Sequence, residues 1–179
     1  MLKRYASFLE EFDKRLKEYF SAHKEFLCCK KGCTECCEIG EYPFSRLEAE
    51  YIMSGYIKLL PNVQLKIKQN IENILKTYKY SENYQCPFLI NKECALYDYR
   101  GIVCRTFGLA YVVNGIVKLP ECVNSGLNYS KVYNKNKKEV ILENPVKENL
   151  MTDKILRSKL AEEYQLECGE IRPLIKWFM

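Results

Sequence analysis

Cys28-Cys29-Lys30-Lys31-Gly32-Cys33-Thr34-Glu35-Cys36-Cys37 is the most informative segment of the chain, because five of its ten residues are cysteines. Cysteines that serve only as core residues are usually scattered singly among other apolar side chains. These five alternate instead with lysines, a threonine and a glutamate, so burial does not explain them. Cysteines clustered at short spacing are typical ligands of zinc and iron–sulfur centres. The segment therefore predicts a metal site.

The spacing within this segment leaves the choice of ligands open. Cys33 and Cys36 are separated by two residues, which lets two sulfurs reach one metal from a single tight turn. Cys29 lies one turn earlier, and Cys28 competes with it for the same place. The side chains of adjacent Cys36 and Cys37 point in different directions. Either one of them is a spare, or the two bind different metals, or they bind opposite sides of one cluster.

A second group of cysteines follows at longer spacings, which only the tertiary fold can bring together. Cys86, Cys94 and Cys104 lie within twenty residues, and Cys122 comes after them. Eight thiolates suit two four-sulfur sites, or one four-sulfur cluster with additional ligands. The predicted metal ligands are Cys29, Cys33, Cys36, Cys37, Cys86, Cys94, Cys104 and Cys122.

Two arginines flank Cys104 in the second group. Arg105 follows it directly, and Arg100 precedes it by four residues. A site with four thiolates carries net negative charge, which a guanidinium offsets while it donates hydrogen bonds to sulfur. We therefore predict that Arg105 contacts the bound cofactor, although a structural ion pair explains an arginine here equally well. The remaining Cys168 and the single histidine, His23, are interpreted as structural residues.

The bulk composition indicates one soluble domain. The chain has 179 residues, of which 47% are apolar and 28% charged, as in ordinary globular proteins. It has no apolar run near the roughly 18 residues of a membrane span, and its N-terminus lacks the apolar core of a signal peptide. These features predict a cytoplasmic protein, where thiols stay reduced and serve as ligands rather than in disulfides. The net charge of +5 is modest and scattered, which disfavours nucleic acid as a partner.

Hydrophobic periodicity predicts helices over residues 2–27, 45–55 and 61–79. The second of these begins with a capping box, Ser45-Arg46-Leu47-Glu48. Residues 80–108 have the composition of loops, and Asn114-Gly115 between two β-branched runs predicts a hairpin over residues 109–119.

The expected fold is mainly α: a small single domain over residues 1–179, with helices around a cysteine-rich metal centre and one short β-hairpin. The cysteine-cluster core spans residues 28–122. Helices over residues 2–27 and 147–165 flank it. The cysteines cross every plausible boundary, which argues against a division into two domains.

The two cysteine groups resemble those of a zinc- or iron-chelating family known as CxxCxxCC or YkgJ-like. Its companion motif, Cys-Pro-Phe-Leu, then Cys-x-x-Tyr, then Arg-Pro-x-x-Cys-Arg, is similar to Cys86-Pro87-Phe88-Leu89, Cys94-Ala95-Leu96-Tyr97 and residues 100–105. The resemblance covers residues 28–122. Two departures are a glycine, Gly101, at the usual proline, which loosens that turn, and a first spacing of Cys-x-x-x-Cys-x-x-Cys-Cys.

This resemblance implies metal chelation in a mostly helical, cysteine-held fold. A related branch, the flagellin lysine N-methylases, consists of proteins that look like iron–sulfur enzymes. This chain is short for such an enzyme, and its eight glycines form neither a dinucleotide-binding fingerprint nor a P-loop. The resemblance therefore implies no settled activity.

Two functions follow from the sequence as expectations. The first is a cysteine-cluster protein that binds an iron–sulfur cluster, of the 4Fe-4S type, with a redox or cluster-dependent enzymatic role. The alternative is a zinc-binding structural or interaction module without catalytic activity. The sequence leaves enzymatic activity undecided. It implies a protein or small-molecule partner of unknown identity, and no association with a membrane.

Overall fold

The computed structural model describes residues 1–30, 32–38, 41–78 and 84–179. About 49% of these residues are helical and 12% lie in strands, with seven α-helices and four two-stranded sheets. The expected fold, with one hairpin and helices around a metal centre, is therefore wrong on two points. The described residues contain four small sheets, and they show no preformed metal centre. The helix expected over 61–79 is confirmed, and it ends at Thr77. Residues 79–83, where the following loop was expected to begin, lie outside the described residues.

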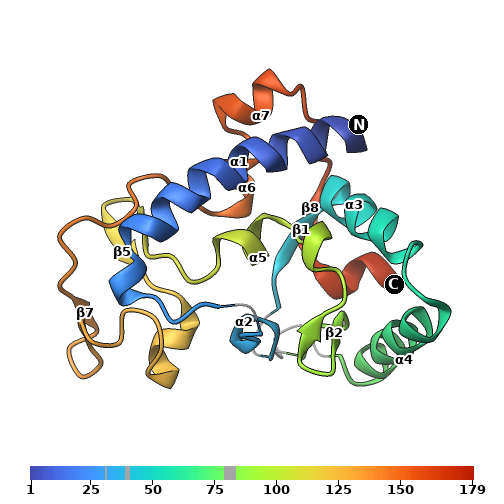
Figure 1. Ribbon diagram of the computed structural model, residues 1–179, viewed down its shortest axis with the longest axis horizontal. Coiled ribbons are helices and arrows are strands. Elements are labelled where there is room, and N and C mark those ends of the chain that lie inside the picture. Colours follow the sequence, from blue (N-terminus) through green and yellow to red (C-terminus); the bar gives the residue numbers. More distant parts are fainter. Residues whose placement is uncertain (31, 39–40, 79–83) are drawn as a thin grey trace.

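Helix α1 (Leu2–Ala22) forms one wall of the main hydrophobic core. Figure 1 shows it as the long blue helix beside α3 (Arg46–Tyr56), which it contacts. Its apolar residues recur every three or four positions, so they share one face of the helix. The buried members of this face are Tyr5, Phe8, Leu9, Phe12 and Leu16. They pack against Leu47, Ile102 and Leu109, among others. A 3₁₀ turn, η1 (Lys24–Phe26), follows α1, so the helix expected over 2–27 is confirmed except at its end.

Helix α3 (Arg46–Tyr56) begins with the predicted capping box, which the structure confirms. The Ser45 hydroxyl accepts a hydrogen bond from the Glu48 N–H at 3.2 Å, and the Glu48 carboxylate accepts from the Ser45 N–H at 2.8 Å. Glu48 is fully buried. Its other oxygen accepts a bond from the Ile102 N–H at 2.8 Å, at the start of helix α5 (Ile102–Thr106). One carboxylate therefore joins the starts of two helices.

A second hydrophobic core lies between α3 and helix α4 (Pro61–Thr77). The C-terminal 3₁₀ helix η4 (Leu174–Phe178) contacts both helices and contributes Leu174 to this core. The end of the chain is held there by strand β8 (Ile171–Pro173), which pairs antiparallel with β1 (Pro43–Ser45). Periodicity does not reveal such short strands, because their pairing joins distant parts of the chain.

The other three sheets are tight hairpins. The hairpin predicted around Asn114-Gly115 is confirmed, since both residues have positive φ and join two paired strands. Two further hairpins were missed, because each strand has only two residues and shows no alternating pattern. The strands of the three hairpins are β4 (Tyr111–Val113) with β5 (Ile116–Lys118), β2 (Leu89–Ile90) with β3 (Glu93–Cys94), and β6 (Tyr133–Asn134) with β7 (Glu139–Val140).

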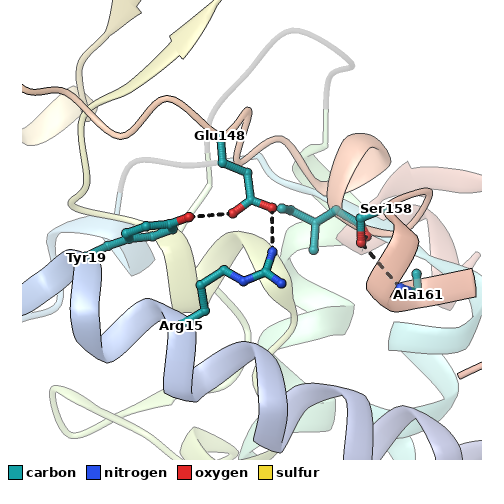
Figure 2. A network of polar contacts seen from close by, with 6 residues as sticks. Arg15, Tyr19, Glu148, Ser158 and Ala161 are labelled. Carbon is teal, nitrogen blue, oxygen red and sulfur yellow. Dashed lines mark hydrogen bonds and ion pairs between the residues drawn. The ribbon is translucent and has the colours of Figure 1, made fainter. Parts of the chain in front are cut away.

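The helix expected over 147–165 is wrong. The structure has two short helices there, α6 (Thr152–Ile155) and α7 (Lys159–Glu163). The Ser158 hydroxyl accepts a hydrogen bond from the Ala161 N–H, so a new helix starts at this point. Preceding them, Glu148 accepts bonds from Arg15 at 2.9 Å and from the Tyr19 hydroxyl at 2.8 Å (Figure 2). These bonds fix the segment before α6 against α1.

The cysteines lie on short elements rather than on the long helices. Helix α2 (Glu35–Glu38) carries Cys36 and Cys37, and α5 carries Cys104. The 3₁₀ helix η3 (Glu121–Ser125) carries Cys122 and contacts α2. Another 3₁₀ turn, η2 (Tyr97–Tyr99), lies between β3 and α5. In the part of the chain that the structure describes, no helix is both long and apolar enough to cross a membrane.

Replacing Glu48 with alanine should lower the free energy of unfolding by about 3 kcal/mol, because the buried Ser45 and Ile102 N–H groups lose their acceptor. The matched control is Glu50→Ala on the same helix. Glu50 forms an exposed ion pair with Arg46, so its loss should cost less than about 1 kcal/mol. Denaturant unfolding of both variants measures the difference. Equal effects would show that the buried carboxylate does not hold α3 and α5 together.

Candidate metal centre

Six cysteines line one cavity of about 120 Å³. They come from α2 and the turn before it, from the β2–β3 hairpin and the turn that precedes it, and from α5. Apolar side chains, among them Phe44, Phe88 and Leu174, form much of the remaining wall. We call this the enclosed cavity. Its cysteines are Cys33, Cys36, Cys37, Cys86, Cys94 and Cys104.

Backbone hydrogen bonds bring the first and second cysteine groups together at this cavity. The Cys86 N–H donates to the Cys37 carbonyl at 2.6 Å, which links the two groups directly. The β2–β3 pairing places Cys94 opposite Leu89. The sulfurs of Cys36 and Cys37 are 3.9 Å apart, so these adjacent residues both contribute to the same cavity. The tertiary fold therefore supplies the convergence that the long spacings required.

Cys104 depends on the close packing at the start of α5. A Cβ atom on Gly101 would lie 2.6 Å from the Phe44 ring and 2.7 Å from the Glu48 carboxylate. Any other residue, proline included, would displace one of these groups. The sequence suggested that Gly101 loosens this turn, but Gly101 is buried and the next N–H is bonded to Glu48. Glycine is therefore required here by the approach of Glu48.

The other cysteines face a second and wider cavity of about 700 Å³, which we call the open cavity. Its own cysteines are Cys28, Cys29 and Cys122, while Cys33, Cys36 and Cys104 line both cavities. The predicted ligands thus fall into two neighbouring groups that share a wall. Among residues 1–30, 32–38, 41–78 and 84–179, no three His, Cys, Asp or Glu side chains already converge as a metal-binding group. Ligation at either cavity would require the thiols to move closer together.

Burial raises the pKa of most of these thiols. For Cys104 burial is the largest cause, and the charges of Cys36 and Cys94 add to it. The bond from Cys36 lowers the pKa of Cys37, but the bond to Cys86 and burial outweigh it and raise this pKa to about 12. Burial, then the neighbouring Cys29 and Cys33, raises the pKa of Cys122 to about 11. These thiols are protonated at neutral pH, so a metal must displace their protons to bind.

The two arginines occupy different positions. Arg105 forms an ion pair with Asp13, and its other nitrogens donate to the carbonyl oxygens of Arg100 (2.8 Å) and Asp98 (3.1 Å). Its contact with a cofactor stays a prediction. Arg100 lines both cavities, and its charge lowers the pKa of Cys36 and Cys104 against the stronger effects that raise them. Of the two arginines, Arg100 is therefore the one whose charge acts on the thiols.

Two side chains that the sequence did not single out belong to the surroundings of the thiols. Asn128 is 1% exposed, and its amide donates to the Cys29 sulfur at 2.9 Å. The Tyr42 hydroxyl is buried without a hydrogen-bond partner among the described residues. Burial, then the charges of Cys36 and Cys104, raises the pKa of Tyr42. No local pattern marks either residue, because both reach the thiols only through the tertiary fold.

His23 and Cys168 lie apart from both cavities. His23 is buried, and its Nδ1 lies 2.8 Å from the Tyr129 hydroxyl. Burial lowers its pKa, so the ring is neutral at pH 7. Cys168 packs against the main hydrophobic core. Sulfur therefore dominates the donor set at the cavities among the described residues, with one carboxylate at each, Glu93 and Glu35. A sulfur-rich donor set is typical of thiolate-bound zinc and of iron–sulfur clusters.

Comparison with known proteins leaves the site to be interpreted on its own geometry. No family model matches the chain, and no curated protein or solved structure matches it either.

Stability of the metal-free chain should fall as the pH rises above about 9. An unfolded thiol loses its proton near pH 8.5, whereas Cys122 holds its proton to about pH 11 and Cys37 to about pH 12 in the folded chain. Between these values the unfolded chain binds fewer protons than the folded chain, so rising pH favours unfolding. Denaturant unfolding at several pH values, with metal absent, measures the slope.

Cys122→Ala should make this decline with pH shallower, because one buried thiol no longer contributes. A decline that is unchanged in this variant, or a stability that rises over the same range, would contradict the assigned shift.

Proposed function

We propose that this chain is a metal-chelating protein that binds an iron–sulfur cluster, of the 4Fe-4S type, in the enclosed cavity. The observation that carries the proposal is a set of six thiols around one largely apolar cavity, with a single carboxylate, Glu93, and no histidine among the described lining residues. Four thiolates, from Cys37, Cys86, Cys94 and Cys104, would ligate the cluster. Cys36 could take the place of Cys37 as the first of these ligands.

The size of the cavity favours a cluster over a single ion. Zinc with Zn–S bonds of about 2.3 Å draws four sulfurs to about 3.8 Å from one another and leaves no space between them. The enclosed cavity has about 120 Å³, whereas roughly 10–15 Å³ holds one water molecule. Space for several atoms between the thiols therefore supports a polynuclear centre.

A bound cluster would supply one-electron redox chemistry. The residues of this chain would tune it. Phe44, Phe88 and Leu174 limit the access of water, and a dry shell alters the potential of a cluster. Arg100 offsets the negative charge of the thiolates. The unpartnered Tyr42 hydroxyl is a hydrogen-bond donor for a thiolate sulfur, which gives this buried group a partner.

The alternative function is a zinc-binding structural or interaction module without catalytic activity. One observation favours it: the cysteines lie on turns and on helices of four or five residues, which fold poorly without a crosslink. Under both functions we propose a cytoplasmic location, because reduced thiols are needed for ligation. The partner would be a protein or a small molecule, with no role for a membrane or for nucleic acid.

Protein purified without air should contain iron and acid-labile sulfide in matching amounts. Cys94→Ser and Cys104→Ser should each lower iron content and the visible cluster absorbance at least severalfold, because each removes one thiolate from the enclosed cavity. Cys168→Ser is the matched control, and it should retain both signals.

Protein that contains zinc and no sulfide would contradict the cluster and support the alternative function, a zinc-binding structural module. Wild-type protein that retains no metal, or full metal content in both Cys94→Ser and Cys104→Ser, would contradict metal binding at the enclosed cavity.

A further inference from the structure

Three thiols of the open cavity are not among the ligands proposed for the cluster in the enclosed cavity, although one of them, Cys33, lines both cavities. Cys29 lies in the loop after η1, Cys33 in the turn before α2, and Cys122 in η3. The contact between α2 and η3 brings the second and third of these segments together. All three cysteines line the same cavity.

The buried side-chain amide of Asn128 holds Cys29 in place. Asn128 donates to the Cys29 sulfur at 2.9 Å and to the Gly108 carbonyl at 3.0 Å, and it accepts from the Cys28 N–H at 2.6 Å. A Cβ on Gly108 would lie 2.5 Å from the Cys29 sulfur, so only glycine leaves room for it. An N–H donor to sulfur is typical support for a metal thiolate. Of the two adjacent cysteines, Cys29 is therefore the better-held ligand.

The charged side chains that line the open cavity are mostly cationic. Four basic residues, Lys30, Lys92, Arg100 and Arg105, line the open cavity with one acidic residue, Glu35. Arg105 is already paired with Asp13. Within the described residues, no ion pair engages Lys30, Lys92 or Arg100. The cavity therefore offers an excess of positive charge to a bound molecule.

Arg100 is held in a fixed orientation in the lining of the open cavity. Its guanidinium lies over the Tyr97 ring, 3.4 Å from the centroid, and its Nε donates to the Tyr97 carbonyl at 2.7 Å. These two contacts leave the terminal nitrogens of the guanidinium as donors. A guanidinium fork matches the two oxygens of a carboxylate or a phosphate.

We infer that Cys29, Cys33 and Cys122 hold a second metal ion, and that its fourth position takes a small oxyanion bound against Arg100. Three protein ligands with one open position are characteristic of reactive zinc-type sites, whereas structural sites are closed by four. The inference rests on the proposed function in that the chain must bind metal through thiolates. It goes beyond that function in assigning a separate, ligand-accessible ion and the chemical class of its ligand.

Cobalt(II) tests the assignment, because its visible absorbance reports on thiolate ligation. The full-length chain, stripped of metal and kept reduced, should bind two cobalt ions. Cys122→Ser should lose the cobalt ion of the open cavity and retain that of the enclosed cavity. Cys94→Ser should lose the ion of the enclosed cavity and retain that of the open cavity. Cys168→Ser should bind both. The probes for the open position are inorganic phosphate and acetate, each titrated into the cobalt-loaded protein.

We expect one of these anions to shift the cobalt absorbance of the wild type and of Cys94→Ser, but not that of Cys122→Ser. A shift with phosphate alone identifies a phosphate ligand, and a shift with acetate alone identifies a carboxylate. Arg100→Gln should weaken the anion at least tenfold while both ions remain bound.

Three outcomes would overturn the inference. Loss of all cobalt in both Cys94→Ser and Cys122→Ser would indicate one shared site. The absence of a shift with either anion would show that the position is closed. Two-site binding in Cys122→Ser would show that this thiol is not a ligand. A wild type that binds no cobalt would instead contradict the proposed function itself.

Discussion

The arrangement of the cysteines depends on the hydrogen bonds that the buried Glu48 side chain accepts. This side chain accepts hydrogen bonds from Ser45 at the start of α3 and from Ile102 at the start of α5. Helix α3 packs in the main core, while α5 carries Cys104, which lines both cavities. A carboxyl group is tolerated at 0% exposure only when its oxygens are well bonded, and burial raises the pKa of Glu48. The approach of this carboxylate also explains why Gly101 has no side chain.

The long helices form the hydrophobic cores and the short segments carry the cysteines, because only the long helices offer large apolar faces. Helices α1, α3 and α4 bury apolar faces and supply the two larger cores. The segments that carry the cysteines are short, and the thiols themselves contribute to the apolar packing around them. Because metal binding supplies folding free energy where packing is sparse, ligation and local order at these segments would be coupled.

The two cavities differ mainly in width. The enclosed cavity has about 120 Å³ and mostly apolar walls, whereas the open cavity has about 700 Å³ and more basic residues in its lining. Cys33, Cys36, Cys104, Lys92 and Arg100 line both. A change of charge at one cavity would therefore be felt at the other, since the low dielectric of a partly buried site screens charges weakly.

The sequence alone determined the helices with strong periodicity, the capping box at Ser45, the hairpin at Asn114 and the candidate ligand set, because each leaves a local pattern of residue types. It did not determine the pairing of β1 with β8, the break near Ser158, or the contacts of Asn128 with Cys29. Nor did it assign cysteines to cavities. Those depend on contacts between distant segments, and the sequence records such contacts only through the packing of the whole chain.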